Sequence, residues 1–206
     1  MVKHTLSTEE KILAAAKTVF HRKGYEGARM QEIADEAEIN KALLHYYFRS
    51  KEKLFQAVFE EAFSELMASA KQIFFSEKPL NEKISAFLIH YISTISENSY
   101  IPWFILNGMY ERPEQLKIIL EKNKINPLLL MDHLKMQIQK EYNADINPFH
   151  IWLNILSMSV FPVVAKPFLM EVFKLNEEAY NQILKERKSV VPQFVISALK
   201  AYEKID

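Results

Sequence analysis

The chain has 206 residues, no net charge and a hydrophobic fraction of 49%. This composition excludes a disordered chain, and the absence of cysteine excludes disulfides and thiolate metal or redox sites. Three glycines and no strand-like alternation favour helices throughout. No apolar run reaches the roughly 18 residues of a membrane span, and MVKHTLSTEE does not resemble a signal peptide. We therefore expect a soluble cytoplasmic protein without a membrane partner.

The sequence of the first 75 residues predicts four helices. The first covers residues 8–22, because Ser7 and Glu10 have the spacing of a capping box and Gly24 lies just past the end. The same segment carries one apolar stripe at helical spacing, made of Ile12, Leu13, Ala16, Val19 and Phe20. Two short helices follow at about 30–37 and 41–47, and a fourth runs from Ser50, its N-cap, to about residue 75.

The remaining residues predict further helices, opened or broken by prolines and capped by asparagines. Pro162 and Pro167 are expected to break the chain, and Pro192 to kink the last helix. The expected helices are 81–97, 103–110, one from 113, 127–142, 148–161 and 176 to about 203. The chain is therefore expected to be all-α, with about nine or ten helices.

Residues 28–55 carry the most informative pattern. One short helix presents Ile33 and Ala34 to Leu44 of the next, and Ile39 can fill the junction within a three-residue turn. This is the packing of a helix-turn-helix. The outward face of the second helix carries Lys41, His45, Tyr46 and Tyr47, which suit phosphates and base edges in a major groove.

Lys51 stands at the start of the next helix. A helix N-terminus with a lysine predicts a phosphate clamp, although an ordinary solvated lysine is the alternative. Packing of Tyr46 or Tyr47 against neighbouring helices also stays open. Residues 1–55 carry ten basic and eight acidic side chains, so the net charge of this region gives little further support for DNA binding.

The same stretch resembles the signature of the TetR family, an IA-x-x-A segment followed by a turn and Lys-x-x-Leu-Tyr-x-x-Phe-x-x-Lys-x-x-Leu. The matching positions, within about 45 N-terminal residues, are Ile33-Ala34, Ala37, Lys41, Leu44, Phe48, Lys51 and Leu54. Three positions depart from the signature. Glu38 replaces the usual turn glycine and is expected near the left-handed region, Arg29 replaces a small residue, and Tyr47 replaces a common histidine.

The resemblance implies a DNA-binding head at 1–50 and a ligand-binding and dimerisation domain at 51–206. It implies a homodimer, joined through the last two long helices, that represses transcription from a palindromic operator in double-stranded DNA and is released by a small hydrophobic ligand. The expected DNA-contacting residues are Arg29, Gln31, Asn40, Lys41, Ala42, His45, Tyr46, Tyr47 and Lys51.

Residues 100–173 are rich in aromatic and apolar side chains. They could line a ligand pocket with a few polar groups, or simply form core. The candidate ligand-binding residues are Trp103, Phe104, Asn107, Tyr110, Met131, His133, Trp152 and Phe161.

Other chemistries have little support. The six histidines lack metal-ligand spacing, and no phosphate loop, nucleophile elbow or carboxylate pair stands out. We expect no metal, cofactor or catalysis. Two alternatives stay open: a helical-bundle enzyme or lipid carrier, and a constitutive DNA-binding protein without an inducer.

Overall fold

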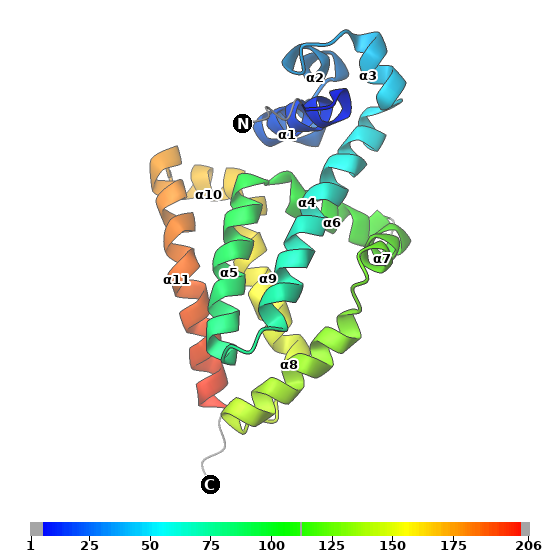
Figure 1. Ribbon diagram of the computed structural model, residues 1–206. Coiled ribbons are helices and arrows are strands. Elements are labelled where there is room, and N and C mark those ends of the chain that lie inside the picture. The colour runs from blue at the N-terminus through cyan, green and yellow to red at the C-terminus, as the bar shows by residue number, and fades with distance from the viewer. Residues whose placement is uncertain (1–5, 112, 203–206) are drawn as a thin grey trace, which may run out of the picture.

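A computed structural model describes residues 6–111 and 113–202, without the side chains of 104, 107–111, 113, 115 and 116. In these ranges the chain forms eleven helices and no strand, which confirms the all-α expectation and corrects the expected number of helices. A small head stands on one end of a long helix, and the larger body surrounds the other end (Figure 1).

The head and its connecting helix follow the predicted order. The helices are α1 (Thr8–Gly27), α2 (Met30–Glu36), α3 (Lys41–Tyr47) and α4 (Lys51–Phe74). The capping box is present: the Glu10 amide donates to Ser7 Oγ at 3.2 Å, and the Ser7 amide donates to Glu10 Oε2 at 2.7 Å. Gly24 has φ 67° and interrupts the helix just past the predicted end at residue 22, as expected; after this kink α1 continues to Gly27.

The body contains the other seven helices. They are α5 (Leu80–Glu97), α6 (Tyr100–Glu111), α7 (Pro113–Lys122), α8 (Pro127–Tyr142), α9 (Pro148–Val164), α10 (Lys166–Val172) and α11 (Glu177–Ala201). The side chains of Asn126, Asn147 and Asn176 accept bonds from the first amides of α8, α9 and α11, as N-caps do. The helix α5 starts one residue before the predicted Asn81, because the Leu80 amide donates to Glu141 Oε2 of α8 at 2.7 Å.

The predicted break at Pro162 does not occur, since α9 continues to Val164. A proline inside a helix leaves the carbonyl four residues earlier without its usual donor. That carbonyl belongs to Met158, and the Arg187 guanidinium of α11 donates to it. The Pro162 carbonyl in turn accepts from the Tyr180 hydroxyl at 3.0 Å. Bonds from α11 therefore stabilise a proline that the local sequence predicts to end the helix.

Two apolar cores meet along α4. Its first half, through Leu54, Phe59 and Phe63, belongs to the core of the head, which also includes Tyr100 and Ile101 of α6. Its second half belongs to the core of the body, with α5, α8, α9 and α11. A rotation of α4 against the body would therefore carry the head with it. The domain boundary at residues 50 and 51 stays a prediction.

Within the described ranges, no single helix is long and apolar enough to cross a membrane. The bent pair of α9 and α10, which meet at 65°, passes that test together by length and composition alone.

Candidate nucleic-acid interface

The two short helices α2 and α3 pack as a helix-turn-helix. Ile33, Ala34 and Leu44 are fully buried, and Ile39 fills the turn half-buried, with its amide donating to the Ala34 carbonyl at 3.0 Å. Glu38 has φ 56°, the left-handed conformation expected where the usual glycine is replaced. The apolar contacts and the turn together hold α3 at a defined angle to α2.

Asn40 and Ala42 lie at the exposed start of α3. The Leu43 amide donates to Asn40 Oδ1 at 2.8 Å, so this asparagine is the N-cap of the helix. Its side-chain nitrogen makes no hydrogen bond to the described residues and can donate outward. Capping thus orders the end of α3 that a helix-turn-helix presents to base edges.

The outward face of α3 carries the other predicted side chains. Lys41, His45, Tyr46 and Tyr47 are all exposed, and Tyr46 reaches 80%. The rings of Tyr46 and Tyr47 meet edge to face, with centroids 5.5 Å apart. A tyrosine exposed to this degree contributes little to a core, so the face fits a surface that binds a partner.

Arg29 and Gln31 lie at the start of α2, beside this face. Arg29 is the exposed residue before the helix and makes no capping bond, while Gln31 Nε2 donates to Asp35 Oδ1 at 2.8 Å. The neighbouring Glu32 carboxylate pairs with Lys23 at 2.6 Å, and this hydrogen bond lowers the pKa of Glu32. Because Lys23 is paired with Glu32, Arg29 is more available than Lys23 to bind an anion at this end of α2.

Lys51 makes bonds that the sequence did not indicate. Its ammonium donates to the Tyr25 carbonyl at 2.8 Å and to the Ala28 carbonyl at 3.3 Å, and lies 4.4 Å from the centroid of the Tyr25 ring. An ammonium has three N–H donors. At least two are used within the head, so at most one is left for a phosphate.

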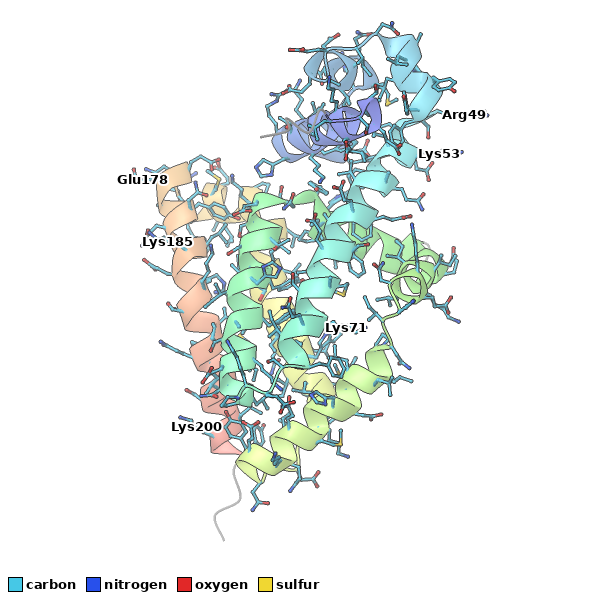
Figure 2. The ribbon with its side chains drawn as sticks, in the orientation of Figure 1. Arg49, Lys53, Lys71, Glu178, Lys185 and Lys200 are labelled. Atoms are coloured by element: carbon cyan, nitrogen blue, oxygen red, sulfur yellow. The ribbon has the colours of Figure 1, made fainter. Side chains whose placement is uncertain are left out.

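Two further cations flank α3, and the sequence reasoning missed them. Arg49 and Lys53 are exposed at the junction of α3 and α4, and both side chains lie at the edge of the molecule beside the start of α4 (Figure 2). Neither makes an ion pair within the described residues. Their spacing of four residues across a helix start was the signal available in the sequence.

Five of the predicted ligand-binding residues have described side chains, and they lie in different surroundings. Trp103 stacks on Tyr25 of the head, with centroids 5.5 Å apart, and His133 Nε2 lies 3.1 Å from the Phe74 carbonyl at the end of α4. Met131 packs half-buried against the body core, Trp152 stacks on Phe149, and Phe161 is 56% exposed. The side chains of Phe104, Asn107 and Tyr110 lie outside the described residues.

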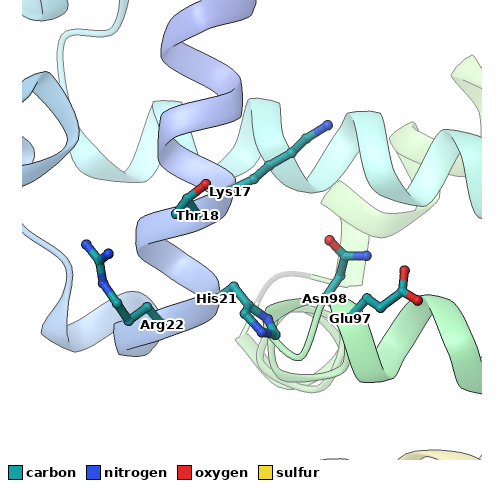
Figure 3. A pocket seen from close by; sticks show the side chains of 6 residues that line it. All are labelled: Lys17, Thr18, His21, Arg22, Glu97 and Asn98. Atoms are coloured by element: carbon teal, nitrogen blue, oxygen red, sulfur yellow. The ribbon is translucent and has the colours of Figure 1, made fainter. Parts of the chain in front are cut away.

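The hollows on the described surface include two that none of these five residues lines. One, of about 550 Å³, lies between α1 and the end of α5; Figure 3 shows its lining residues Lys17, Thr18, His21, Arg22, Glu97 and Asn98. The other, of about 260 Å³, lies between α9 and α11 and is lined by Ile151, Asn154, Met158, Phe194, Val195 and Ala198. Both hollows are open to solvent.

The head has the geometry of a helix-turn-helix DNA-binding regulator, and comparisons agree. Residues 12–58 match the model of the bacterial regulatory proteins, tetR family. The transcriptional repressor NicS of Pseudomonas putida is 42% identical over 28% of this chain, which is 27% of its own length. The probable transcriptional regulator YttP of Bacillus subtilis is 24% identical over 83% of this chain and 84% of its own.

The whole fold is also shared. The fatty acid degradation regulator FadR from Bacillus halodurans superimposes with a TM-score of 0.65 over 94% of this chain and 96% of its own, at 17% identity. The head of the chain thus matches the TetR family over residues 12–58, and the described chain shares its fold with solved regulators, among them a putative TetR-family transcriptional regulator from Mesorhizobium loti with a TM-score of 0.55 over 93% of this chain and 96% of its own, at 17% identity.

Proposed function

We propose that the protein is a dimeric repressor that binds a palindromic operator and is released by a small hydrophobic ligand. The exposed face of α3 carries this proposal, because Lys41, His45, Tyr46 and Tyr47 are presented outward from a helix whose inner side is buried. Donors, acceptors and aromatic rings on such a helix read base edges in the major groove.

Around that face, the remaining predicted residues position the head on the duplex. Arg29, Gln31, Asn40 and Ala42 lie at the starts of α2 and α3, where backbone amides and cations bind phosphate. Lys51 contributes at most one donor, so the stronger phosphate contacts come from Arg49 and Lys53. Cations that neutralise phosphates contribute affinity without base preference.

The dimer would form through α9 and α11, the last two long helices. The exposed side of α11 has a stripe of Ile183, Val190 and Phe194, and the exposed side of α9 carries Leu153 and Phe161. In a monomer both stripes would be exposed to water. In a dimer with a two-fold axis beside them, each stripe would be buried against the same surface of the second copy. Two heads related by that axis read half-sites about 34–36 Å apart.

Release would act through α6. Trp103 stacks on Tyr25 of α1 and meets the Phe55 ring of α4 edge-on, with centroids 6.1 Å apart. A ligand that binds better to a conformer with a displaced α6 would shift this contact, and with it the angle of the head. Residues 100–106 are all apolar or aromatic, so the ligand would be mainly hydrophobic.

A gel shift with the DNA upstream of the protein's own gene tests the proposal. We expect a specific complex whose affinity falls steeply with salt, and whose half-sites are related by a dyad. Hydrophobic compounds are then screened for release, with the fluorescence of the two tryptophans as a second readout. Equal affinity for operator-region and random DNA of the same length would exclude a sequence-specific repressor.

A constitutive DNA-binding protein without an inducer is the second candidate. It is favoured by one observation: among the described ligand candidates, Trp103 stacks on Tyr25, Trp152 stacks on Phe149 and His133 lies beside the Phe74 carbonyl, so these three have separate neighbours. A specific complex that no hydrophobic compound releases would support this candidate against the first.

A further inference from the structure

The outward face of α3 has a centre that helical geometry defines. Leu44 is fully buried and marks the inward side of the helix. Since successive residues turn by about 100°, Ala42 and Tyr46 lie within roughly 20° of the opposite direction, and Leu43 and His45 flank them. All four side chains are exposed. We call these four residues the reading centre, because they are the part of α3 that faces the floor of a groove.

The reading centre lacks the side chains that recognise purines in pairs of hydrogen bonds. Arginine or lysine reads guanine in this way, and asparagine or glutamine reads adenine. The reading centre has no guanidinium, ammonium or carboxamide group. Lys41 lies only about 60° from Leu44 around the helix, so it points away from the centre. Because only His45 and Tyr46 have a side-chain hydrogen-bonding atom, the rest of the centre is suited to an apolar group on a base.

Leu43 is the large aliphatic side chain of the reading centre. It is 36% exposed, whereas the neighbouring Leu44 is fully buried. Ala42 has only a methyl group, so a base edge can approach the helix closely beside Leu43. One turn further along, the Tyr46 ring meets the Tyr47 ring edge to face, with centroids 5.5 Å apart, and this contact favours one orientation of the Tyr46 ring. Leu43, Ala42 and the Tyr46 ring together present an apolar surface.

The charges beside the reading centre indicate which partner meets this apolar surface. Arg49 and Lys53 are exposed and make no ion pair within the described residues. An apolar protein surface would leave both cations without a counter-charge, whereas a DNA duplex supplies phosphates along its groove. Among the base edges in the major groove of DNA, only that of thymine carries a methyl group. An RNA duplex is a poor match, since side chains cannot read its deep and narrow major groove.

We infer that Leu43, Ala42 and Tyr46 form a receptor for the C5 methyl group of thymine, so that each half-site carries a thymine opposite the outward face of α3. The inference rests on the proposed binding to an operator and adds the identity of a base to it. Taking one methyl group out of water contributes about fourfold in affinity. A dimer that meets two such thymines gains roughly fifteenfold, the product of the two factors.

Replacing thymine with deoxyuridine removes this methyl group and leaves the hydrogen bonds of the base pair unchanged. The probe is the DNA upstream of the protein's own gene, amplified once with dTTP and once with dUTP, and fluorescence anisotropy measures its affinity for the full chain. A random-sequence fragment of equal length, made in both forms, is the control. We expect the deoxyuridine form of the upstream DNA to bind about fifteenfold more weakly than the thymine form, and the two random fragments to bind equally.

Two variants assign the effect to a side chain. Leu43→Ala removes most of the apolar side chain, so its preference for thymine over deoxyuridine DNA should fall from about fifteenfold to about threefold or less. The matched control is Lys53→Ala, which should bind both forms more weakly and keep the wild-type ratio, because a phosphate contact does not depend on the base. Circular dichroism checks that both variants are folded at the temperature of the assay.

The outcomes separate the inference from the proposed function. A wild-type chain that binds the thymine form specifically, and the deoxyuridine form equally well, would overturn the inference and leave the repressor in place. A preference for thymine that Leu43→Ala keeps in full would also overturn it, since the methyl groups would then act through another side chain or through the shape of the DNA. Equal affinity for upstream and random thymine DNA would exclude both.

A test with 5-methylcytosine needs no substitution in the protein. This base carries its methyl group at the same place in the major groove as thymine, but it pairs with guanine. Single deoxyuridine substitutions first locate the sensitive position of a half-site, and cytosine or 5-methylcytosine then replaces that base, with guanine opposite. We expect the methylated base to bind about fourfold more tightly than cytosine. Equal affinities would show that α3 reads the base pair and not its methyl group, and would overturn the inference even if every variant folded poorly.

Discussion

Replacing Lys51 distinguishes a lysine that holds the head together from one that binds DNA. In Lys51→Ala, the carbonyls of Tyr25 and Ala28 lose a cationic donor, and the Tyr25 ring loses a cation 4.4 Å from its centroid. Hydrogen bonds to charged groups contribute about 1.5–3 kcal/mol each, and a cation–π contact about 0.5–1 kcal/mol. At a half-buried site water replaces part of this stabilisation, so we expect Lys51→Ala to lower the free energy of unfolding by about 2–3 kcal/mol.

The matched control is Lys53→Ala, two residues further along α4. Lys53 is exposed and makes no ion pair within the described part of the chain, so its loss should leave stability unchanged. Each kcal/mol shifts the melting temperature by about 2–4 °C for chains of this size. Lys51→Ala should therefore melt about 4–12 °C lower, as measured by circular dichroism, while Lys53→Ala melts with the wild type.

DNA binding should show the reverse pattern. Fluorescence anisotropy at several salt concentrations gives the slope of log K against log salt, which changes by about 0.9 for each phosphate contact. We expect Lys53→Ala to reduce the magnitude of the slope by about that amount, and Lys51→Ala to reduce it by less. A Lys51→Ala variant with the wild-type melting temperature and a slope smaller by a full unit would refute this reasoning and favour the clamp.

Four further predictions follow from other parts of the structure. Tyr46→Ala should lower discrimination between operator and random DNA by about 1–3 kcal/mol with an unchanged melting temperature, because the side chain is 80% exposed; cooperative destabilisation would mark it as core. Trp103→Ala should change the operator affinity of the ligand-free protein, since the ring contacts the head; an unchanged affinity would place its role in ligand binding. Burial raises the pKa of Tyr91, so its contribution to stability is present below pH about 10 and is lost as pH rises from there; Tyr91→Phe should flatten the alkaline decline in unfolding free energy, and identical pH profiles would contradict this. Lys83 is only 2% exposed, but its ammonium is not among the buried unpartnered groups and makes no ion pair or hydrogen bond to the described residues, so the stem is buried while the ammonium reaches the surface; Lys83→Met should therefore leave the free energy of unfolding within about 1 kcal/mol, and a larger gain would show that the ammonium is buried unpaired.

The parts of the fold that sequence reasoning predicted are those specified by neighbours in the chain. A capping box needs only Ser7 and Glu10, an N-cap needs only Asn40 and the helix after it, and a three-residue turn without glycine places Glu38 at positive φ. The helix-turn-helix core is equally local, because Ile33 and Leu44 are eleven positions apart. Such features can be predicted from the sequence without knowing how the rest of the molecule folds.

Only the tertiary structure decided the features that depend on distant residues. Pro162 stays inside α9 because Arg187, on another helix, donates to the carbonyl that the proline leaves without its usual donor. Lys51 is turned toward the carbonyls of Tyr25 and Ala28, and Trp103 stacks on Tyr25 of the head. A side chain's periodicity shows that it will be buried or exposed, but not which element will meet it, since that depends on how the helices pack.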